Sequence, residues 1–107
     1  MSESSSLSSC VDSFLAQLKR ENASEHTLRN YRMDLQQFCR YFTVQNATPS
    51  PDQIDALAIR EWMGGLYQAE LSAVTIRRKL AAVRSMFKHL QHTGIISSNI
   101  ARHVRTP

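Results

Sequence analysis

The chain has 107 residues, 42% of them apolar and 21% charged, which fits a single globular domain and excludes a disordered or collagen-like chain. Its net charge of +4 is unevenly distributed: residues 1–70 carry 6 basic and 9 acidic side chains, or −3, whereas residues 71–107 carry 7 basic and no acidic ones, or +7. Such a basic segment indicates an anionic partner, with nucleic acid first, an anionic membrane surface second, and a merely solvated helix face as the alternative.

The cysteine content and the N-terminus indicate where the protein resides. Cys10 and Cys39 are too few for a disulfide framework, and nothing beside them has metal-ligand spacing. We therefore expect a reducing, cytoplasmic location and neither a metal ion nor a cofactor. The serine-rich start lacks the regions of a signal peptide, and no apolar run reaches the ~18 residues that cross a bilayer. Residues 1–10 are expected to form a flexible tail.

The first apolar pattern predicts a helix over residues 11–22, with Ser8 or Ser9 as its N-cap. Its apolar residues lie at i, i+3, i+4 and i+7, on one face of a helix: Val11, Phe14, Leu15 and Leu18. A second pattern predicts a helix over residues 25–44, capped by Ser24, through Leu28, Tyr31, Leu35, Phe38 and Phe42.

An exposed connection is expected over residues 45–52, because Pro49 and Pro51 restrict the backbone there. A third helix is predicted over residues 56–69, from Ile59, Trp62, Met63 and Leu66. Gly64 and Gly65 each cost about 1 kcal/mol relative to alanine inside a helix. Close packing against a neighbouring element is the explanation that we favour for them, and a bend is the alternative.

The last pattern predicts a helix over residues 73–93, with Ser72 as its N-cap and Gly94 just after its end. Its apolar residues step by three and four: Ile76, Leu80, Val83, Phe87 and Leu90. Residues 97–107 have little periodic pattern and are expected to form a linker. Because no stretch is typical of a strand, the predicted fold class is all-α, with four helices.

The fourth predicted helix carries the basic residues that an anionic partner would meet. At ~100° per residue, Arg77, Arg84 and Lys88 form a stripe about a right angle away from the apolar residues, and Arg78 lies farther from them. No acidic residue of the same helix can pair with them. This favours phosphate contact over a solvated face.

The start of the second predicted helix also suits an anion or a base edge. His26, Thr27, Arg29 and Asn30 share its first two turns with unpaired backbone N–H groups, and a major groove admits a helix. An ordinary capped terminus is the alternative. Catalysis finds no support, since the four histidines have no catalytic spacing to a cysteine or carboxylate. We assign no catalytic residue.

The combined pattern resembles a known family. The residues that carry the resemblance are Ser24 to Tyr31 with Asp34, Leu35 and Phe38, then Leu71 to Leu80, Ala82 to Phe87, and Gly94 to Asn99. They are similar to the N-terminal core-binding domain of tyrosine recombinases, above all of Xer-type recombinases and phage integrases. The similarity spans residues 11–107. One position departs from the family, which usually has proline where Ile100 follows Asn99.

The resemblance implies a SAM-like four-helix domain over residues 11–96 that forms half of a clamp around double-stranded DNA. In that family a separate catalytic domain follows the linker, so this chain is expected to bind DNA without cleaving it. Further recombinase subunits would join in a tetramer, for chromosome dimer resolution or for integration. The resemblance places these residues against DNA: His26, Thr27, Arg29, Asn30, Thr75, Arg77, Arg78 and Lys79. The stripe argument adds Arg84 and Lys88.

A second hypothesis from another class is a helical protein–protein interaction module that mediates oligomer assembly. Small helical domains also serve this role, and fold alone does not fix function. Concentration-dependent mass in the absence of DNA would favour it.

Overall fold

The computed structural model describes residues 6–105, which form four α-helices and two short 3₁₀ helices. These are α1 (Leu7–Arg20), α2 (Glu25–Phe42), η1 (Pro51–Gln53), α3 (Ala56–Gln68), α4 (Ala73–His92) and η2 (Ile100–His103). Within residues 6–105 no strand forms, which confirms the all-α, four-helix prediction. None of the helices in this range is long and apolar enough to cross a membrane.

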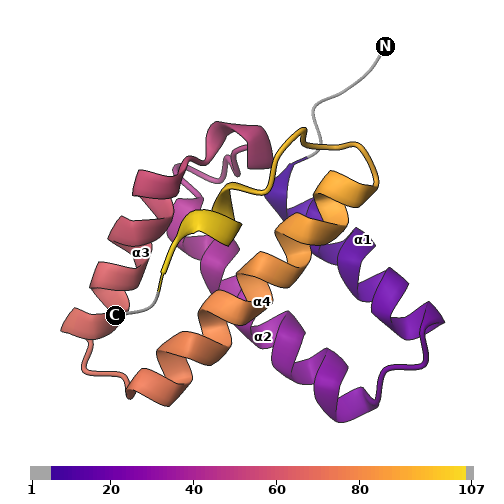
Figure 1. Cartoon of the computed structure of the whole chain (residues 1–107), viewed down its shortest axis with the longest axis horizontal. Helices are drawn as coiled ribbons and strands as arrows, with labels where there is room; N and C mark the ends of the chain where they lie inside the picture. Colours follow the sequence, from indigo (N-terminus) through magenta and orange to yellow (C-terminus); the bar gives the residue numbers. More distant parts are fainter. Residues whose placement is uncertain (1–5, 106–107) are drawn as a thin grey trace.

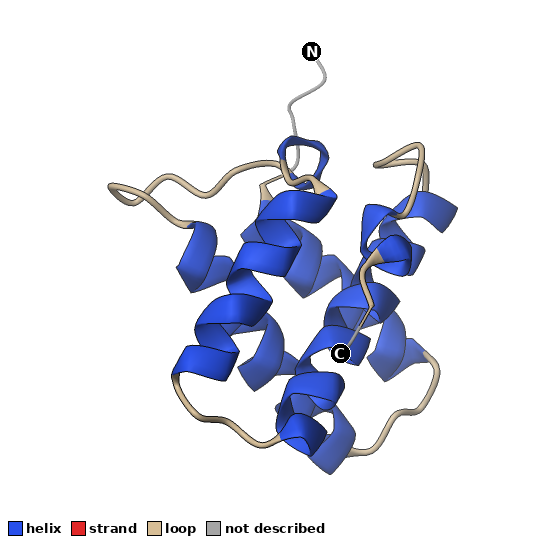
Figure 2. Ribbon diagram, turned by 60° about the vertical axis from the view of Figure 1, so that its left-hand side comes forward, coloured by secondary structure: helices blue, strands red, loops and turns tan. Residues whose placement is uncertain are grey.

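The longest helix, α4, organises the fold. It packs against α1, α2 and α3, and in Figure 1 it runs diagonally across α2 with α1 on one side and α3 on the other. Figure 2 shows that the loops joining α1 to α2 and α3 to α4 lie at the same end of the molecule. Consequently α2 and α4 both begin at that end.

Serine caps define where the helices begin. The hydroxyls of Ser24 and Ser72 accept hydrogen bonds from the backbone amides of Thr27 and Thr75, as the sequence predicted. Helix α1 differs from the prediction, because its N-cap is Ser6 rather than Ser8 or Ser9.

The early start of α1 corrects the predicted tail. Leu7 and Cys10 are 0% and 1% exposed, and they extend the apolar face of Val11 by one turn toward the N-terminus. Residues 7–10 therefore belong to the folded domain. Ser6 is the N-cap of α1. The remaining part of the predicted tail, residues 1–5, lies outside the described residues.

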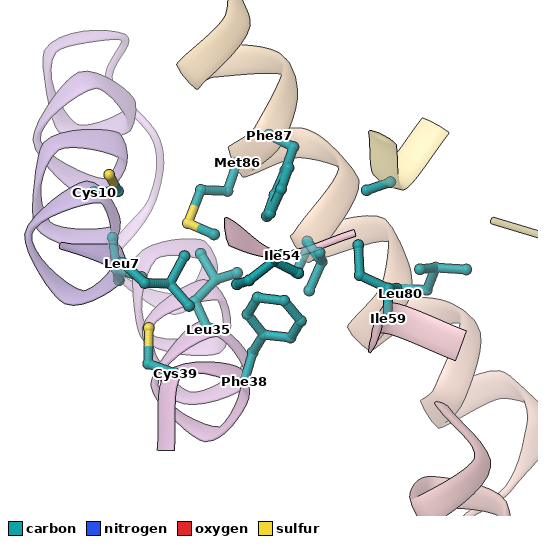
Figure 3. Close-up of a cluster of buried hydrophobic side chains, with 14 of the residues drawn as sticks. Leu7, Cys10, Leu35, Phe38, Cys39, Ile54, Ile59, Leu80, Met86 and Phe87 are labelled. Carbon is teal, nitrogen blue, oxygen red and sulfur yellow. The ribbon is translucent and has the colours of Figure 1, made fainter. Parts of the chain in front are cut away.

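The core lies where the four helices meet. Figure 3 shows one cluster of buried side chains to which all four helices contribute: Leu7 of α1, Leu35 and Phe38 of α2, Ile59 of α3 and Leu80 of α4. The Phe38 ring is fully buried and makes edge-on contacts with three other rings, at centroid distances of 4.9 Å to Phe42, 4.9 Å to Trp62 and 6.3 Å to Phe87. Such pairs stabilise by about 0.5 to 1.5 kcal/mol beyond the area that they bury. Phe38 is therefore a centre of the packing.

Both cysteines belong to this core and neither forms a disulfide. Burial raises the pKa of the Cys39 thiol to about 12, with smaller contributions from Cys10 and Asp12, and burial also raises the pKa of Cys10. Since the thiolate is the nucleophile, both groups are unreactive at neutral pH.

The glycine pair in α3 does not pack closely, so that prediction is wrong. Gly64 and Gly65 are exposed, and a Cβ added to either one would meet no atom within 4 Å beyond the backbone of its own part of α3. Gly94 behaves as expected: it follows α4 with a φ of +85°, which favours glycine.

Because that space is open, Gly65→Ala should stabilise the protein. We expect the free energy of unfolding to rise by about 0.5 to 1 kcal/mol, since alanine lowers the entropy of the unfolded chain. Urea denaturation followed by circular dichroism measures this change. Gly94→Ala is the contrasting control, because its positive φ strains any residue with a Cβ; a destabilised Gly65→Ala would contradict the argument.

The segment after α4 folds back onto the domain. Helix η2 contacts both α3 and α4, and Ala101 and Val104 are each 0% exposed. Two apolar residues three positions apart suffice to bury one side of a 3₁₀ turn, where side chains at i and i+3 align. The described part of residues 97–107, predicted as a linker, is thus a docked exit segment up to Val104.

Candidate nucleic-acid interface

The starts of α2 and α4 repeat one local pattern. Each has Ser-x-x-Thr followed by an apolar residue and Arg, with Ser24 and Ser72 in the first position. The serine hydroxyl accepts from the threonine amide at 3.1 Å in both helices and donates to the threonine hydroxyl at 2.9 Å in α2 and 3.0 Å in α4. Both helices begin at the same end of the molecule (Figures 1 and 2). That end therefore presents two similar helix starts.

On α2, the predicted residues divide into exposed and half-buried ones. His26 and Arg29 are exposed, whereas Thr27 and Asn30 are half-buried. The Asn30 amide nitrogen lies 3.2 Å from His26 Nε2, so the two polar side chains hold each other at the surface. Arg29 is the cation of this turn that an anion can reach.

On α4, Arg77 is exposed and Thr75 is half-buried under its cap. Lys88 is also exposed, about three turns farther along the helix than Arg77. It shares a surface hollow with Arg102 of the docked exit segment, a residue that sequence reasoning had not singled out. The basic face thus extends from α4 onto the exit segment.

Arg78 and Lys79 lie where α4 crosses α2, and both pair with one carboxylate. Arg78 donates from Nε to Asp34 Oδ2 and from Nη2 to Asp34 Oδ1, each at 3.0 Å. Lys79 Nζ donates to Asp34 Oδ1 at 3.0 Å and also to the side-chain oxygen of Gln37. We call Asp34, Arg78 and Lys79 the Asp34 cluster.

The Asp34 cluster adds a partner that the helix itself lacks, and it changes the expected position of Lys79. The acid absent from α4 comes from α2, so two of the basic residues do have an anionic partner, and these are the two ion pairs within residues 6–105. Lys79, with its side chain 8% exposed, does not lie on the face where the resemblance placed it. Arg78 remains accessible, at 48% exposed.

Arg84 also differs from the prediction. Its Nε donates to the Ala101 carbonyl at 3.2 Å and its Nη2 donates to the Val104 carbonyl, while Asn99 donates to the Arg84 carbonyl at 3.4 Å. The half-buried guanidinium thus holds the exit segment instead of extending the exposed stripe. The sequence of α4 alone could not predict these hydrogen bonds of Arg84, because the acceptors are backbone carbonyls 17 and 20 residues away.

A metal site has no residues to support it in the described part of the chain. Residues 6–105 contain no group of three or more histidine, cysteine, aspartate or glutamate side chains placed to hold a metal ion. What the exposed residues can do chemically is bind an anion through Arg29, Arg77, Arg78 and Lys88.

Comparison with known proteins identifies the family to which the chain is similar. Residues 11–94 match the family described as phage integrase, N-terminal SAM-like domain. Three curated relatives, each named Tyrosine recombinase XerC, are 36% identical over 92 residues in Syntrophus aciditrophicus, 35% over 98 in Halalkalibacterium halodurans and 36% over 95 in Natranaerobius thermophilus.

These matches cover 80%, 91% and 88% of this chain but only 30%, 32% and 32% of the three relatives. The chain thus spans about a third of the length of the relatives that it matches. No solved structure matches it at a significant level.

Proposed function

The chain belongs to the phage integrase N-terminal SAM-like domain family, and from this premise we propose that it binds double-stranded DNA through the starts of α2 and α4. The observation that carries the proposal is the shared end of the two helices, where Arg29, Arg77 and Arg78 are exposed on similar capped turns. Each helix start adds unpaired backbone amides and the positive end of its dipole, which favour phosphate.

The dimensions and charges suit a major groove. An α-helix with its side chains is about 10 to 12 Å across, and the major groove of B-DNA is about 12 Å wide. Residues 71–107 carry seven basic and no acidic side chains, so the surface that α4 brings to the groove does not repel phosphates. His26 and Asn30, held together at 3.2 Å, add hydrogen-bonding groups beside Arg29.

The wider role follows from the relatives. We propose that the chain is the core-binding part of a site-specific tyrosine recombinase and clamps a recombination site while a catalytic domain cleaves and rejoins the strands. Further recombinase subunits would bind the same site in a tetramer. Chromosome dimer resolution and mobile-element integration are the two reactions to which such a protein would contribute.

Arg29→Ala tests the interface. We expect weaker binding to a short duplex and a smaller salt dependence, because each phosphate contact contributes about −0.9 to the slope of log affinity against log salt. Fluorescence anisotropy from 50 to 200 mM salt measures both. Arg40→Ala is the matched control, since it removes an exposed arginine from the last turn of the same helix.

NMR titration of the wild-type chain with a palindromic duplex places the contact. Salt-sensitive shifts at residues 24–31 and 74–78 are expected. Shifts confined to other surfaces, or an affinity independent of salt, would overturn the proposal.

One surface favours the alternative of a protein–protein interaction module. Tyr41 and Val44, at the end of α2 away from the proposed interface, are 51% and 68% exposed. Neighbouring exposed apolar side chains are typical of contact surfaces between proteins. Sedimentation equilibrium without DNA separates the two functions: a rising mass with concentration, abolished by Tyr41→Ser, would support assembly through this surface.

A further inference from the structure

The Arg78 side chain is both fixed in orientation and accessible from solvent. Its guanidinium is held in one orientation by two hydrogen bonds of 3.0 Å to Asp34, whose own side chain is only 3% exposed. Yet the Arg78 side chain is 48% exposed. A long side chain normally loses rotamer entropy when it binds a ligand, and here the fold has already restricted it.

The donors that remain on Arg78 form a matched pair. A guanidinium has five N–H groups in one plane, and Asp34 takes one from Nε and one from Nη2. The other N–H of Nη2 and both N–H groups of Nη1 are left, and the edge between these two nitrogens faces away from the carboxylate. That edge can donate two parallel hydrogen bonds to a single partner.

The Asp34 cluster keeps its positive charge. Lys79 Nζ also lies 3.0 Å from Asp34 Oδ1, so one carboxylate faces two cations. Because Lys79 is buried and Arg78 is exposed, the excess charge is presented at the surface by Arg78. Asp34 thus orients Arg78 without cancelling its attraction for an anionic or electron-rich partner.

We propose that Arg78 recognises a guanine base in the major groove and that Asp34 is the positioning residue that orients it. Guanine presents two acceptors, O6 and N7, that match the free edge of an arginine side chain. A phosphate can accept hydrogen bonds from many directions, whereas a base edge accepts them from one direction in the plane of the base. A guanidinium held in one orientation suits the base edge. This inference rests on the proposed DNA binding and adds the base class that the site reads.

The first test measures base preference. The wild-type chain is incubated with a randomised duplex library at low salt, and the bound fraction is sequenced. We expect a guanine preference of about 5- to 150-fold at one position, the range of one bidentate base contact. Arg78→Lys keeps the positive charge but lacks the two parallel N–H donors of the guanidinium. It should therefore abolish the guanine preference at that position and leave the preferences at other positions unchanged. Arg77→Ala, the neighbouring control, should weaken all sequences alike.

A chemical probe isolates the acceptor. In the selected duplex the preferred guanine is replaced by 7-deazaguanine, which lacks the N7 acceptor and keeps Watson–Crick pairing. We expect the wild-type chain to lose at least about 5-fold in affinity, as for one lost base contact. Arg78→Lys should bind the two duplexes equally. Equal loss in both proteins would overturn the assignment of Arg78 to this base.

The role of Asp34 needs a variant that folds. Removing Asp34 alone would leave the buried ammonium of Lys79 without an anionic partner and destabilise the fold. The Asp34 variants are therefore made in a Lys79→Met background. Lys79→Met keeps the Asp34–Arg78 pair and should retain the guanine preference, whereas Asp34→Asn with Lys79→Met should lose most of it while keeping non-specific affinity. Rescue by Asp34→Glu in the same background would support an orienting carboxylate.

The outcomes separate this inference from the function on which it rests. No binding to any duplex at low salt would overturn both. Salt-dependent binding without a guanine preference, or with a preference that Arg78→Lys leaves intact, would overturn only the assignment of Arg78. A preference unchanged between Lys79→Met and the double variant would overturn the role of Asp34.

Discussion

Asp34→Asn is expected to lower the free energy of unfolding by about 3 to 5 kcal/mol, the cost of removing one partner from a buried ion pair. The carboxylate is 3% exposed and accepts three hydrogen bonds of 3.0 Å from α4. Its loss leaves the ammonium of Lys79, 8% exposed, without an anion where α2 and α4 cross. Arg78 can turn to solvent, but Lys79 cannot do so without unpacking the helices.

Urea denaturation followed at 222 nm measures this effect, and a second variant controls it. Asp34→Asn with Lys79→Met removes the stranded charge and should recover most of the lost stability, since apolar replacement of a buried ion pair is often neutral. An Asp34→Asn protein within about 1 kcal/mol of wild type would contradict the role of the Asp34 cluster in joining α2 to α4.

Phe38→Ala should destabilise the protein by a similar amount, about 3 to 5 kcal/mol. The Phe38 ring is 0% exposed and lies between Phe42, Trp62 and Phe87, so alanine leaves a cavity lined by three helices. Since a domain of this size has about 5 to 15 kcal/mol of stability in total, this single substitution removes a large part of it.

The matched control is Val44→Ala, two residues beyond the end of α2 and 68% exposed. A surface truncation of this kind should change stability by less than about 0.5 kcal/mol. Thermal unfolding of the two variants compares them directly. If Phe38→Ala cost no more than Val44→Ala, the packing of the three rings around Phe38 could not be what holds α2 to α3 and α4.

The helices could be predicted because their signals are local. An apolar residue every three or four positions and a serine cap are read within one segment, and the observed α2 and α4 agree with the prediction to within two residues at each end. The start of α1 was missed because Leu7 lies among serines. Close packing of the α3 glycines was wrongly predicted, because the presence of glycine inside a helix does not indicate whether that side of the helix faces solvent or a neighbouring element.

The surroundings of the candidate interface residues were predicted less completely, for a physical reason. Arg29, Arg77 and Arg78 stand on exposed sides of their helices, which the helical period indicates. Lys79 lies three residues after Ile76 and four before Val83, so its place on the apolar stripe was readable from the same period. Its partner Asp34 is 45 residues away and the acceptors of Arg84 are backbone carbonyls, and only tertiary structure brings these together.

The docking of the exit segment has a mechanical consequence. Arg84 of α4 donates hydrogen bonds to the Ala101 and Val104 carbonyls and so holds the exit segment against this helix. The first turns of the same helix carry Arg77 and Arg78. In the proposed complex with DNA, the position at which the backbone leaves the domain would therefore change with the orientation of α4 in the groove. Any polypeptide that followed Val104 would start at a fixed position and in a fixed direction relative to α4. The effective concentration of a group that it carried would then depend on the orientation of α4 more than on the length of a flexible linker.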